Sequence, residues 1–226
     1  MRKLVAVLFA AGLLLGCSKD RRPSAPKERV VRDIPAAADS RPVIVALGDS
    51  LTAGLGVDPA LNYPSKLQAK IDAAGYRYRV INEGVSGDTS AQGVNRLEAV
   101  LELRPKTVIL ELGANDGLRG LSLEDTEHNL QTIVRRLEQG GCSVVLAGME
   151  IPPNYGPEYT RRFRELFPRL SSDDHTALIP FFLADVAGRA DLNQGDGIHP
   201  TAEGYDVVVQ NVWKVLEPLL RESAGR

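Results

Sequence analysis

Five short apolar runs alternate with amphipathic segments along most of this chain, and this alternation limits its possible folds more than any other feature. The runs are rich in β-branched residues and cover Val43–Leu47, Arg79–Asn82, Thr107–Leu112, Ser143–Ala147 and Ala177–Phe182. Short runs of this kind indicate strands of a parallel sheet that is covered on both faces. Strands that alternate with helices indicate repeated βαβ units.

The segments between these runs carry apolar residues at helical spacing. They predict helices over Pro64–Ala74, Ser90–Leu101, Ser122–Gly140, Tyr159–Leu170 and Thr201–Leu216. Right-handed crossovers between parallel strands leave few topologies for five strands. We therefore predict an α/β fold of the flavodoxin-like, three-layer α/β/α kind, with a five-stranded parallel sheet in the order 2-1-3-4-5.

Composition and charge exclude several classes of protein. Hydrophobic residues make up 43% of the 226 residues, which suffices for a core and is too little for a polytopic membrane protein. The formal net charge of −2 gives no reason to expect nucleic acid or another strongly charged partner. The two cysteines, Cys17 and Cys142, cannot form a zinc-type cysteine cluster. We expect one domain with extensions, and a monomer.

The N-terminal 17 residues resemble the signal peptide of a bacterial lipoprotein. Two basic residues precede an apolar stretch, Leu4–Leu15, that is too short to span a membrane. The tetrapeptide that ends at Cys17 resembles a lipobox, in which the cysteine becomes the lipidated N-terminus. We expect a membrane anchor made of acyl chains on Cys17. An ordinary signal peptide with an incidental cysteine is the alternative.

Residues 18–41 are rich in charge, proline and alanine and show no apolar period. This composition predicts a flexible tether, so residues 42–226 would form the folded domain. The expected location is the bacterial cell envelope, facing the periplasm. Ser18 after the cysteine favours the outer membrane.

Polar residues follow the predicted strands at the points where the strands end. Ser50 follows the first strand, Gly87 the second and Asn115 the third, while Asp196 and His199 lie between the fifth strand and the last helix. The carboxyl ends of parallel strands lie at one edge of a sheet, so these loops are expected to converge. Ser50 and Asn115 would flank the switch point between the first and third strands.

These residue types suit nucleophilic catalysis. Ser50 is a candidate nucleophile, and His199 is the candidate base that it needs. Asp196 can accept a hydrogen bond from the second imidazole nitrogen and fix the tautomer. The backbone N–H groups of Ser50 and Gly87 and the side-chain amide of Asn115 are candidate oxyanion-hole donors. Each motif alone is more often a turn, a loop or a helix start, but together they predict a reactive site.

The motifs resemble those of the SGNH (GDSL) hydrolase family, in the family's order. The matching segments are Gly48-Asp-Ser-Leu51, Ser86-Gly-Asp-Thr-Ser90, Glu111–Gly120, Asn154-Tyr-Gly156 and Asp196-Gly-Ile-His-Pro200. They are most similar to the periplasmic multifunctional acyl-CoA thioesterase/lysophospholipase subgroup, whose members are also called arylesterases. The resemblance covers the chain from about Val43 onward. The lipobox and the tether depart from the plain signal peptide of that subgroup.

The resemblance implies a serine esterase or thioesterase of the SGNH hydrolase fold. Its substrates would be aryl esters, lysophospholipids and acyl thioesters, cleaved through an acyl-enzyme without cofactor or metal. It assigns Ser50 as nucleophile, His199 and Asp196 as base and orienter, and Gly87 and Asn115 as oxyanion donors.

Two segments after the third and fourth strands are candidates for binding the acyl chain. We predict an apolar groove that is lined by Leu118, Leu121, Ile151 and Tyr155; the alternative is surface loops with scattered apolar residues.

Three other functions stay open at this point. A carbohydrate acetylesterase could use the same fold. A flavodoxin-like binding module could cradle phosphate at Leu47–Gly56, but it would leave Asn115 and the Asp196–His199 pair without a role. A structural lipoprotein with a degenerate hydrolase fold is disfavoured, because every reactive position is occupied by a suitable residue.

Overall fold

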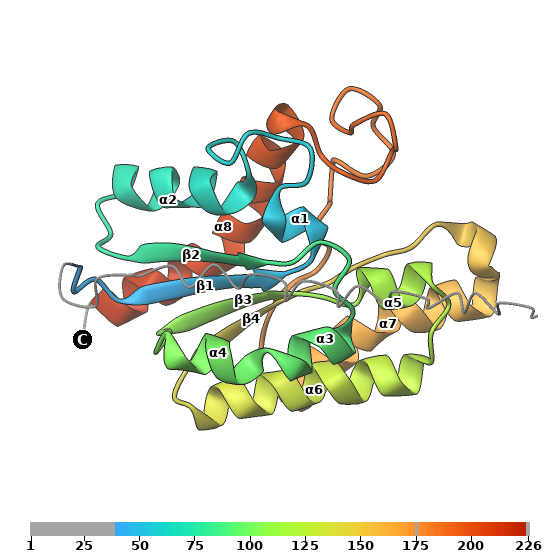
Figure 1. Ribbon diagram of the computed structural model, residues 1–226, viewed down its shortest axis with the longest axis horizontal. Coiled ribbons are helices and arrows are strands. Elements are labelled where there is room, and N and C mark those ends of the chain that lie inside the picture. The colour runs from blue at the N-terminus through green and yellow to red at the C-terminus, as the bar shows by residue number, and fades with distance from the viewer. Residues whose placement is uncertain (1–38, 175, 225–226) are drawn as a thin grey trace, which may run out of the picture. The chain divides into compact units, whose positions relative to one another are not determined.

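A five-stranded parallel sheet forms the centre of the structure (Figure 1), a computed structural model that describes residues 39–174 and 176–224. The strands are β1 (Val43–Gly48), β2 (Arg79–Gly84), β3 (Thr107–Glu111), β4 (Ser143–Ala147) and β5 (Ala177–Ile179). Their order is β2-β1-β3-β4-β5, which confirms the predicted topology. The predicted leader with Cys17 and nearly all of the predicted tether lie outside the described residues.

Strand β1 is an interior strand of the sheet and is buried along its whole length. It pairs in parallel with β2 on one side and β3 on the other; Val45, for example, lies between Ile81 and Val108. Central parallel strands are covered on both faces, which explains why this segment reads as a continuous apolar run. Its C-terminal end therefore holds whatever follows it, Asp49 and Ser50, in a fixed place.

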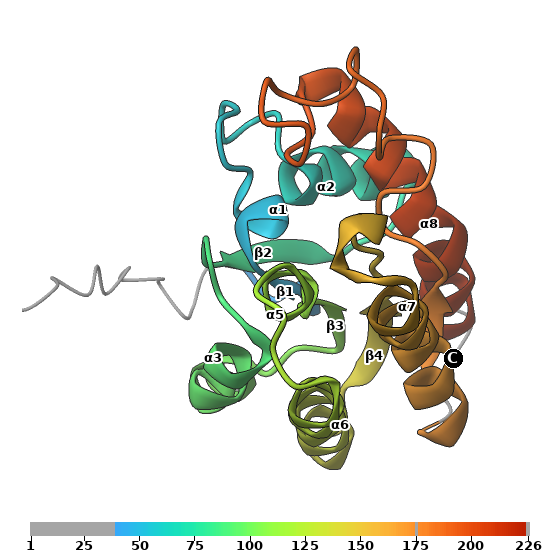
Figure 2. The same ribbon diagram turned by 90° about the vertical axis from the view of Figure 1, so that its right-hand side faces the viewer.

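Helices cover both faces of the sheet. The helices are α1 (Ser50–Ala53), α2 (Tyr63–Ala73), α3 (Ser90–Asn95), α4 (Leu97–Glu102), α5 (Ala114–Leu118), α6 (Leu123–Gln139), α7 (Pro157–Asp173) and α8 (Ala202–Ala224), with a 3₁₀ turn at Pro153–Tyr155. Figures 1 and 2 show α2 and α8 on one face and α3, α4, α6 and α7 on the other. None of the helices within the described ranges is both long and apolar enough to cross a membrane.

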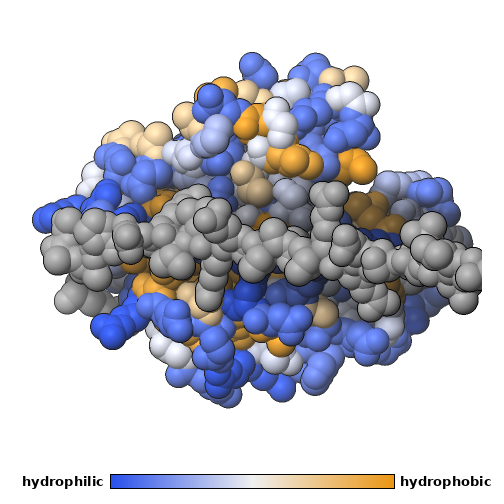
Figure 3. Space-filling view, viewed as in Figure 1, coloured by the Kyte–Doolittle hydropathy of each residue, from blue (hydrophilic) through white to orange (hydrophobic). Residues whose placement is uncertain are grey.

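The helices turn their apolar sides to the sheet. Leu130, Ile133 and Leu137 of α6 are fully buried, as are Phe163 and Leu166 of α7. Burial of such side chains contributes about 1.5–3 kcal/mol each. Outside the grey segment, the face in Figure 3 is mostly hydrophilic, with apolar side chains in small separate areas. Because helices pack their apolar sides against both faces of the sheet, the three-layer arrangement predicted from the helical spacing is confirmed.

Several predicted elements differ from the structure at their ends. The helix predicted over Ser90–Leu101 is interrupted at Arg96, where the backbone has φ −110° and ψ 8°. Strand β5 stops at Ile179, before Pro180, which has no N–H for strand pairing. Helix α7 continues through Pro168, whose effect on the helix end was uncertain from sequence.

Two short helices were missed by the sequence analysis. One residue, Asp49, separates β1 from helix α1, and two residues separate β3 from helix α5. With four and five residues, they are too short to show a helical period. Figure 2 shows both at the carboxyl end of the sheet. They place Ser50 and Asn115 on helical turns instead of on irregular loops.

Candidate active site

Ser50, His199 and Asp196 form a continuous hydrogen-bonded row at the carboxyl edge of the sheet. The Ser50 Oγ lies 2.9 Å from His199 Nε2, and His199 Nδ1 lies 2.7 Å from Asp196 Oδ2. Ser50 and His199 are 149 positions apart in the sequence. The structure therefore brings together the three residues that the sequence analysis chose as nucleophile, base and orienter.

Ser50 is the first residue of α1, so its backbone N–H has no acceptor within that helix. The side chain of Asp49 caps the helix by accepting from the N–H of Leu51 at 3.0 Å. At the other end, Gly54 takes a left-handed conformation with φ +79°, and its N–H donates to the Ser50 carbonyl. These contacts close a single helical turn behind the serine and leave its hydroxyl facing His199.

A tight turn fixes the position of His199. The Oδ1 of Asp196 accepts from the backbone N–H groups of Ile198 at 2.9 Å and His199 at 3.0 Å, while its Oδ2 faces the imidazole. The backbone N–H of His199, then that of Ile198, lowers the pKa of Asp196 from 3.8 to about 2. Asp196 is therefore ionised at neutral pH, although 46% of its side chain is exposed.

The Asn115 side chain is held by two acceptors. Its Nδ2 donates to Asp49 Oδ2 at 2.9 Å and to the backbone carbonyl of Asp88 at 3.0 Å. These contacts join the turns after β1, β2 and β3, which are the three turns that carry the candidate oxyanion donors. A cavity of about 160 Å³ beside these turns is lined by Ser50, Asn115 and His199, among others.

Gly87 lies on the turn after β2 and has φ +85°, a conformation that favours glycine. Its carbonyl accepts from the Arg119 guanidinium at 2.8 Å. The next residue, Asp88, forms an ion pair with Arg96 at 2.7 Å. Arg96 also donates to the carbonyls of Glu83 and Gly48, which tie this turn to the ends of β2 and β1. Gly87 is not among the residues that line the cavity at Ser50.

A buried carboxyl pair, Asp49 and Glu111, lies behind the serine; from sequence, Asp49 was expected mainly to serve loop structure, and Glu111 was given no role. Asp49 is 1% exposed and Glu111 is fully buried. Burial raises the pKa of Asp49 to about 6. Burial, followed by the charge of Asp49, raises the pKa of Glu111 well above its ordinary value. The available signal was a single acidic residue at the end of an otherwise apolar strand.

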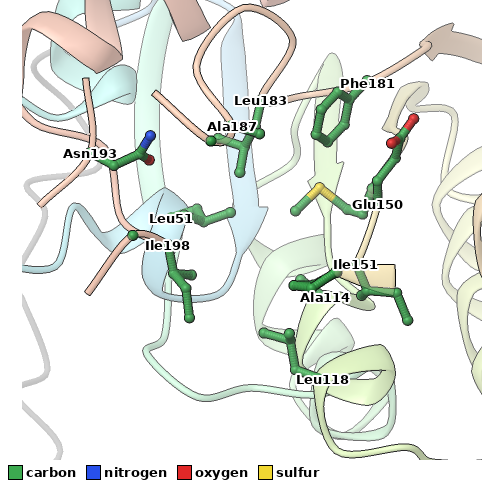
Figure 4. Close-up of a pocket in the computed structure, with 14 residues that line it drawn as sticks. Leu51, Ala114, Leu118, Glu150, Ile151, Phe181, Leu183, Ala187, Asn193 and Ile198 are labelled. Carbon is green, nitrogen blue, oxygen red and sulfur yellow. The ribbon is translucent and has the colours of Figure 1, made fainter. Parts of the chain in front are cut away.

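A larger cavity of about 420 Å³ opens next to the serine turn (Figure 4). It shares lining residues with the smaller cavity, namely Leu51, Ala114, Leu118 and Ile198. Figure 4 shows mostly apolar side chains around this space. The two cavities therefore form adjoining parts of one apolar depression that leads away from Ser50.

Two of the four residues predicted to line an acyl groove do line this cavity. These are Leu118 and Ile151. Leu121 does not, and it is 42% exposed. Tyr155 does not either, because its hydroxyl is directed to the Leu118 carbonyl, to which it donates at 2.7 Å. The structure therefore places these two positions outside the lining of the cavity.

The opposite wall of the cavity comes from a segment that the sequence analysis did not connect with the site; it placed Phe181 in the fifth strand, Ala177–Phe182, and gave Leu183, Ala187 and Gly188 no role. Phe181, Leu183, Ala187 and Gly188, which follow β5, line it together with Ile198, the residue before His199. The segment has no regular apolar period, so sequence gave no signal for it. Within the part of the chain that the structure describes, no cluster of three or more His, Cys, Asp or Glu could hold a metal ion.

Comparison with known proteins gives consistent matches. The sequence pattern of the GDSL-like Lipase/Acylhydrolase family matches residues 46–207. Esterase TesA of Pseudomonas aeruginosa is 42% identical over 178 residues, which are 78% of this chain and 89% of that protein. Thioesterase 1/protease 1/lysophospholipase L1 of Escherichia coli K12 is 35% identical over 190 residues, which are 84% of this chain and 88% of that protein.

A solved structure agrees with these matches. The psychrotrophic esterase EstA from a Pseudoalteromonas species, in a structure inhibited by monoethylphosphonate, aligns with a TM-score of 0.75 at 36% identity. The alignment covers 79% of this chain and 98% of that one. The described domain thus corresponds to nearly the whole of that esterase.

Proposed function

This chain belongs to the GDSL-like lipase/acylhydrolase family, and from that membership we propose that Ser50, His199 and Asp196 are the catalytic triad of its ester hydrolysis. The protein is a serine esterase or thioesterase that cleaves acyl esters. The observation that carries the assignment of the triad is the hydrogen-bonded row from Ser50 Oγ through the imidazole to the Asp196 carboxylate.

The first half of the reaction acylates Ser50. The Oγ attacks the ester carbonyl as His199 Nε2, 2.9 Å away, removes its proton. The Asp196 carboxylate accepts a hydrogen bond from the Nδ1–H of His199 at 2.7 Å, so the unprotonated Nε2 faces the serine. The same carboxylate stabilises the imidazolium that forms. His199 then gives its proton to the leaving alcohol or thiol. In the second half, His199 removes a proton from a water molecule that attacks the acyl-enzyme carbonyl, and it returns that proton to Ser50 Oγ as the acid leaves.

The developing negative charge on the carbonyl oxygen requires donors. We assign the backbone N–H of Ser50, which is free at the start of α1, the backbone N–H of Gly87 and the Asn115 amide. In the free enzyme, Asn115 donates to Asp49 and to the Asp88 carbonyl. One of these two bonds must be shared with the oxyanion when substrate binds. We assign the other bond, to the Asp49 carboxylate, as the contact that keeps the amide aligned.

The adjoining cavities favour an acyl chain over an acetyl group. An apolar space of about 420 Å³ continues from the cavity at Ser50 and is lined by Leu118, Ile151 and Phe181, among others. Burial of each methylene group in such a space contributes about 0.8 kcal/mol. We therefore propose aryl esters, lysophospholipids and acyl thioesters of medium or long chain as substrates, in preference to acetylated carbohydrates.

A substrate panel tests this proposal. The full chain in detergent micelles is assayed with acyl-CoA, lysophospholipid, aryl esters of two to sixteen carbons and an acetylated sugar. The proposal expects kcat/KM to rise with acyl length before it levels off. An enzyme that is fastest on the acetylated sugar would instead be a carbohydrate acetylesterase.

We also propose that the protein is a lipoprotein of the cell envelope that faces the periplasm. Acyl chains on Cys17 would anchor it in the membrane. Residues 18–41 would be the tether, and residues 42–226 the hydrolase domain. The lipobox-like sequence before Cys17 and Ser18 after it support an anchor in the outer membrane. Expression in a Gram-negative host with a labelled fatty acid tests this. Cys17→Ala should abolish labelling and membrane association, and Cys142→Ala should keep both. Absence of label from the unmodified chain would contradict the anchor.

A further inference from the structure

Glu111 contacts the two residues that flank the Ser50–Leu51 pair. Its Oε2 accepts from the Thr52 hydroxyl at 2.7 Å and from the backbone N–H of Asp49 at 3.3 Å. The side chain is fully buried at the end of β3, beside the end of β1. It thus holds the turn that carries Ser50 from within the protein, without contacting Ser50 itself.

The chain leaves room for this contact at Gly48. A Cβ at this position would lie 2.0 Å from Thr52 Oγ1 and 2.5 Å from Glu111 Oε2. Only glycine therefore lets the carboxyl group of Glu111 pass the last residue of β1 and reach the serine turn. The side chain of Glu111 therefore packs closely against the backbone of β1 at Gly48.

A second set of hydrogen bonds connects the same turn to the oxyanion asparagine. Asp49 accepts from the Leu51 N–H at 3.0 Å through Oδ1 and from the Asn115 amide at 2.9 Å through Oδ2. Because Glu111 accepts from the backbone of Asp49, it supports the residue that orients Asn115. One buried carboxyl group therefore lies behind both Ser50 and Asn115.

This arrangement costs stability. Burial of a carboxyl group is unfavourable unless its polar atoms are satisfied, and Glu111 Oε1 has no hydrogen-bond partner in the described part of the chain. The titratable groups that surround the pair are Tyr63 from α2, Tyr205 from α8 and His199, which interacts with Asp49. An apolar side chain would fill this position at lower cost, so stability alone does not account for a carboxyl group here.

We propose that Glu111 is a positioning residue of the esterase, which acts through Asp49 and Thr52 to hold Ser50 and Asn115 in the geometry that the reaction needs. This inference rests on the proposed catalytic roles of Ser50 and Asn115. Both hydrogen bonds of Glu111 end on the turn that carries Ser50. The inference therefore predicts an effect of Glu111 on turnover in addition to any effect on folding.

The test compares Glu111→Met with Glu111→Gln in the full chain. Glu111→Met removes the acceptor and nearly keeps the volume, and we expect kcat to fall about 10- to 100-fold, as misplacement of reacting groups by up to about 1 Å can do. KM for a short aryl ester should change less than threefold. Glu111→Gln keeps one acceptor oxygen and should recover most of the lost kcat. Thr52→Val, which removes one of the two donors, should give a smaller loss.

Two controls keep the outcome interpretable. Val108→Ala, a buried change on the same strand β3 at a position that pairs with Val45 and Val144, should lower the melting temperature and leave kcat per folded molecule unchanged. If Glu111→Met does not fold, Thr52→Val and Glu111→Gln decide. The inference is overturned if Glu111→Met, or in its absence Thr52→Val, keeps the kcat of the unmodified enzyme. Retention of activity by Ser50→Ala would instead refute the proposed function.

Discussion

The carboxylate of Asp49 accepts a hydrogen bond from the Asn115 amide at 2.9 Å, so the residue before the candidate nucleophile holds the candidate oxyanion donor. The two residues are 66 positions apart and lie on turns after neighbouring strands. The same Asp49 side chain caps the helix that begins at Ser50. The candidate nucleophile and the candidate oxyanion donor are therefore positioned by one shared carboxylate.

Asn115→Ala should reduce kcat by about 10²- to 10³-fold, because removal of one preformed oxyanion donor costs about that much. KM should change little, since the donor acts mainly on the transition state. Steady-state kinetics with an aryl ester measures both values. A loss confined to KM would show that Asn115 binds substrate without stabilising the oxyanion.

The stability of the protein should depend on pH through Asp49. Its pKa is raised from 3.8 to about 6 by burial, so the folded state binds this proton more tightly than the unfolded state. The favourable contribution is present below pH 3.8 and is lost as the pH rises through 6. A shift of this size corresponds to about 3 kcal/mol.

Urea unfolding of the unmodified chain and of Asp49→Asn at pH 4, 5, 6 and 7 measures this dependence. The free energy of unfolding of the unmodified chain, relative to the variant, should fall by about 2 kcal/mol between pH 4 and 7, since this range begins just above the unfolded pKa of 3.8 and misses part of the total. Exposed groups that titrate in both proteins contribute equally to the two free energies of unfolding, so their contributions cancel in the difference. A difference that stays constant with pH would mean that Asp49 is not buried as described.

Gly48→Ala should destabilise the fold by at least about 1–3 kcal/mol, because its added methyl group would overlap Thr52 Oγ1 and Glu111 Oε2. Gly195→Ala is the matched control, since a Cβ there would meet no atom within 4 Å. Thermal unfolding of the two variants gives the comparison. Equal melting temperatures would refute the tight fit between β1 and Glu111.

Much of this architecture can be predicted from the sequence, for reasons that particular residues make clear. Val43–Leu47 and Thr107–Leu112 read as buried strands because both of their faces are covered, and the topology follows from their alternation with helices. Ser50, Asn115 and His199 could be placed at one edge because parallel strands end there together. These predictions needed only periodicity and chain order.

The missed features depend on contacts that no local pattern encodes. Arg96 interrupts a helix to reach the carbonyls of Gly48 and Glu83, which are distant in the sequence. Tyr155 turns its hydroxyl to the Leu118 carbonyl instead of facing the cavity. The loop with Phe181 and Leu183 enters the wall of the cavity because of its position after β5 and not because of its spacing. Tertiary packing determined each of these outcomes.

Acyl-chain preference should respond to Leu118 and not to Leu121. Leu118 lines both cavities, whereas Leu121 is exposed and lines neither. Leu118→Asp should lower kcat/KM for aryl esters of eight or more carbons at least about tenfold more than for the acetate, because it places a charge in an apolar space. Leu121→Asp should leave the ratio unchanged. An equal effect of both variants on this ratio would show that the acyl chain does not bind in this cavity.

The central claim is that Ser50 is the nucleophile, and its direct test is the turnover of Ser50→Ala beside the unmodified chain, with intact-mass analysis after treatment with an organophosphonate ester. The account predicts a fall in kcat of at least ~10³-fold and a single covalent adduct, on Ser50, in the unmodified chain alone. Full esterase activity in Ser50→Ala, or an adduct that persists in that variant, would contradict it.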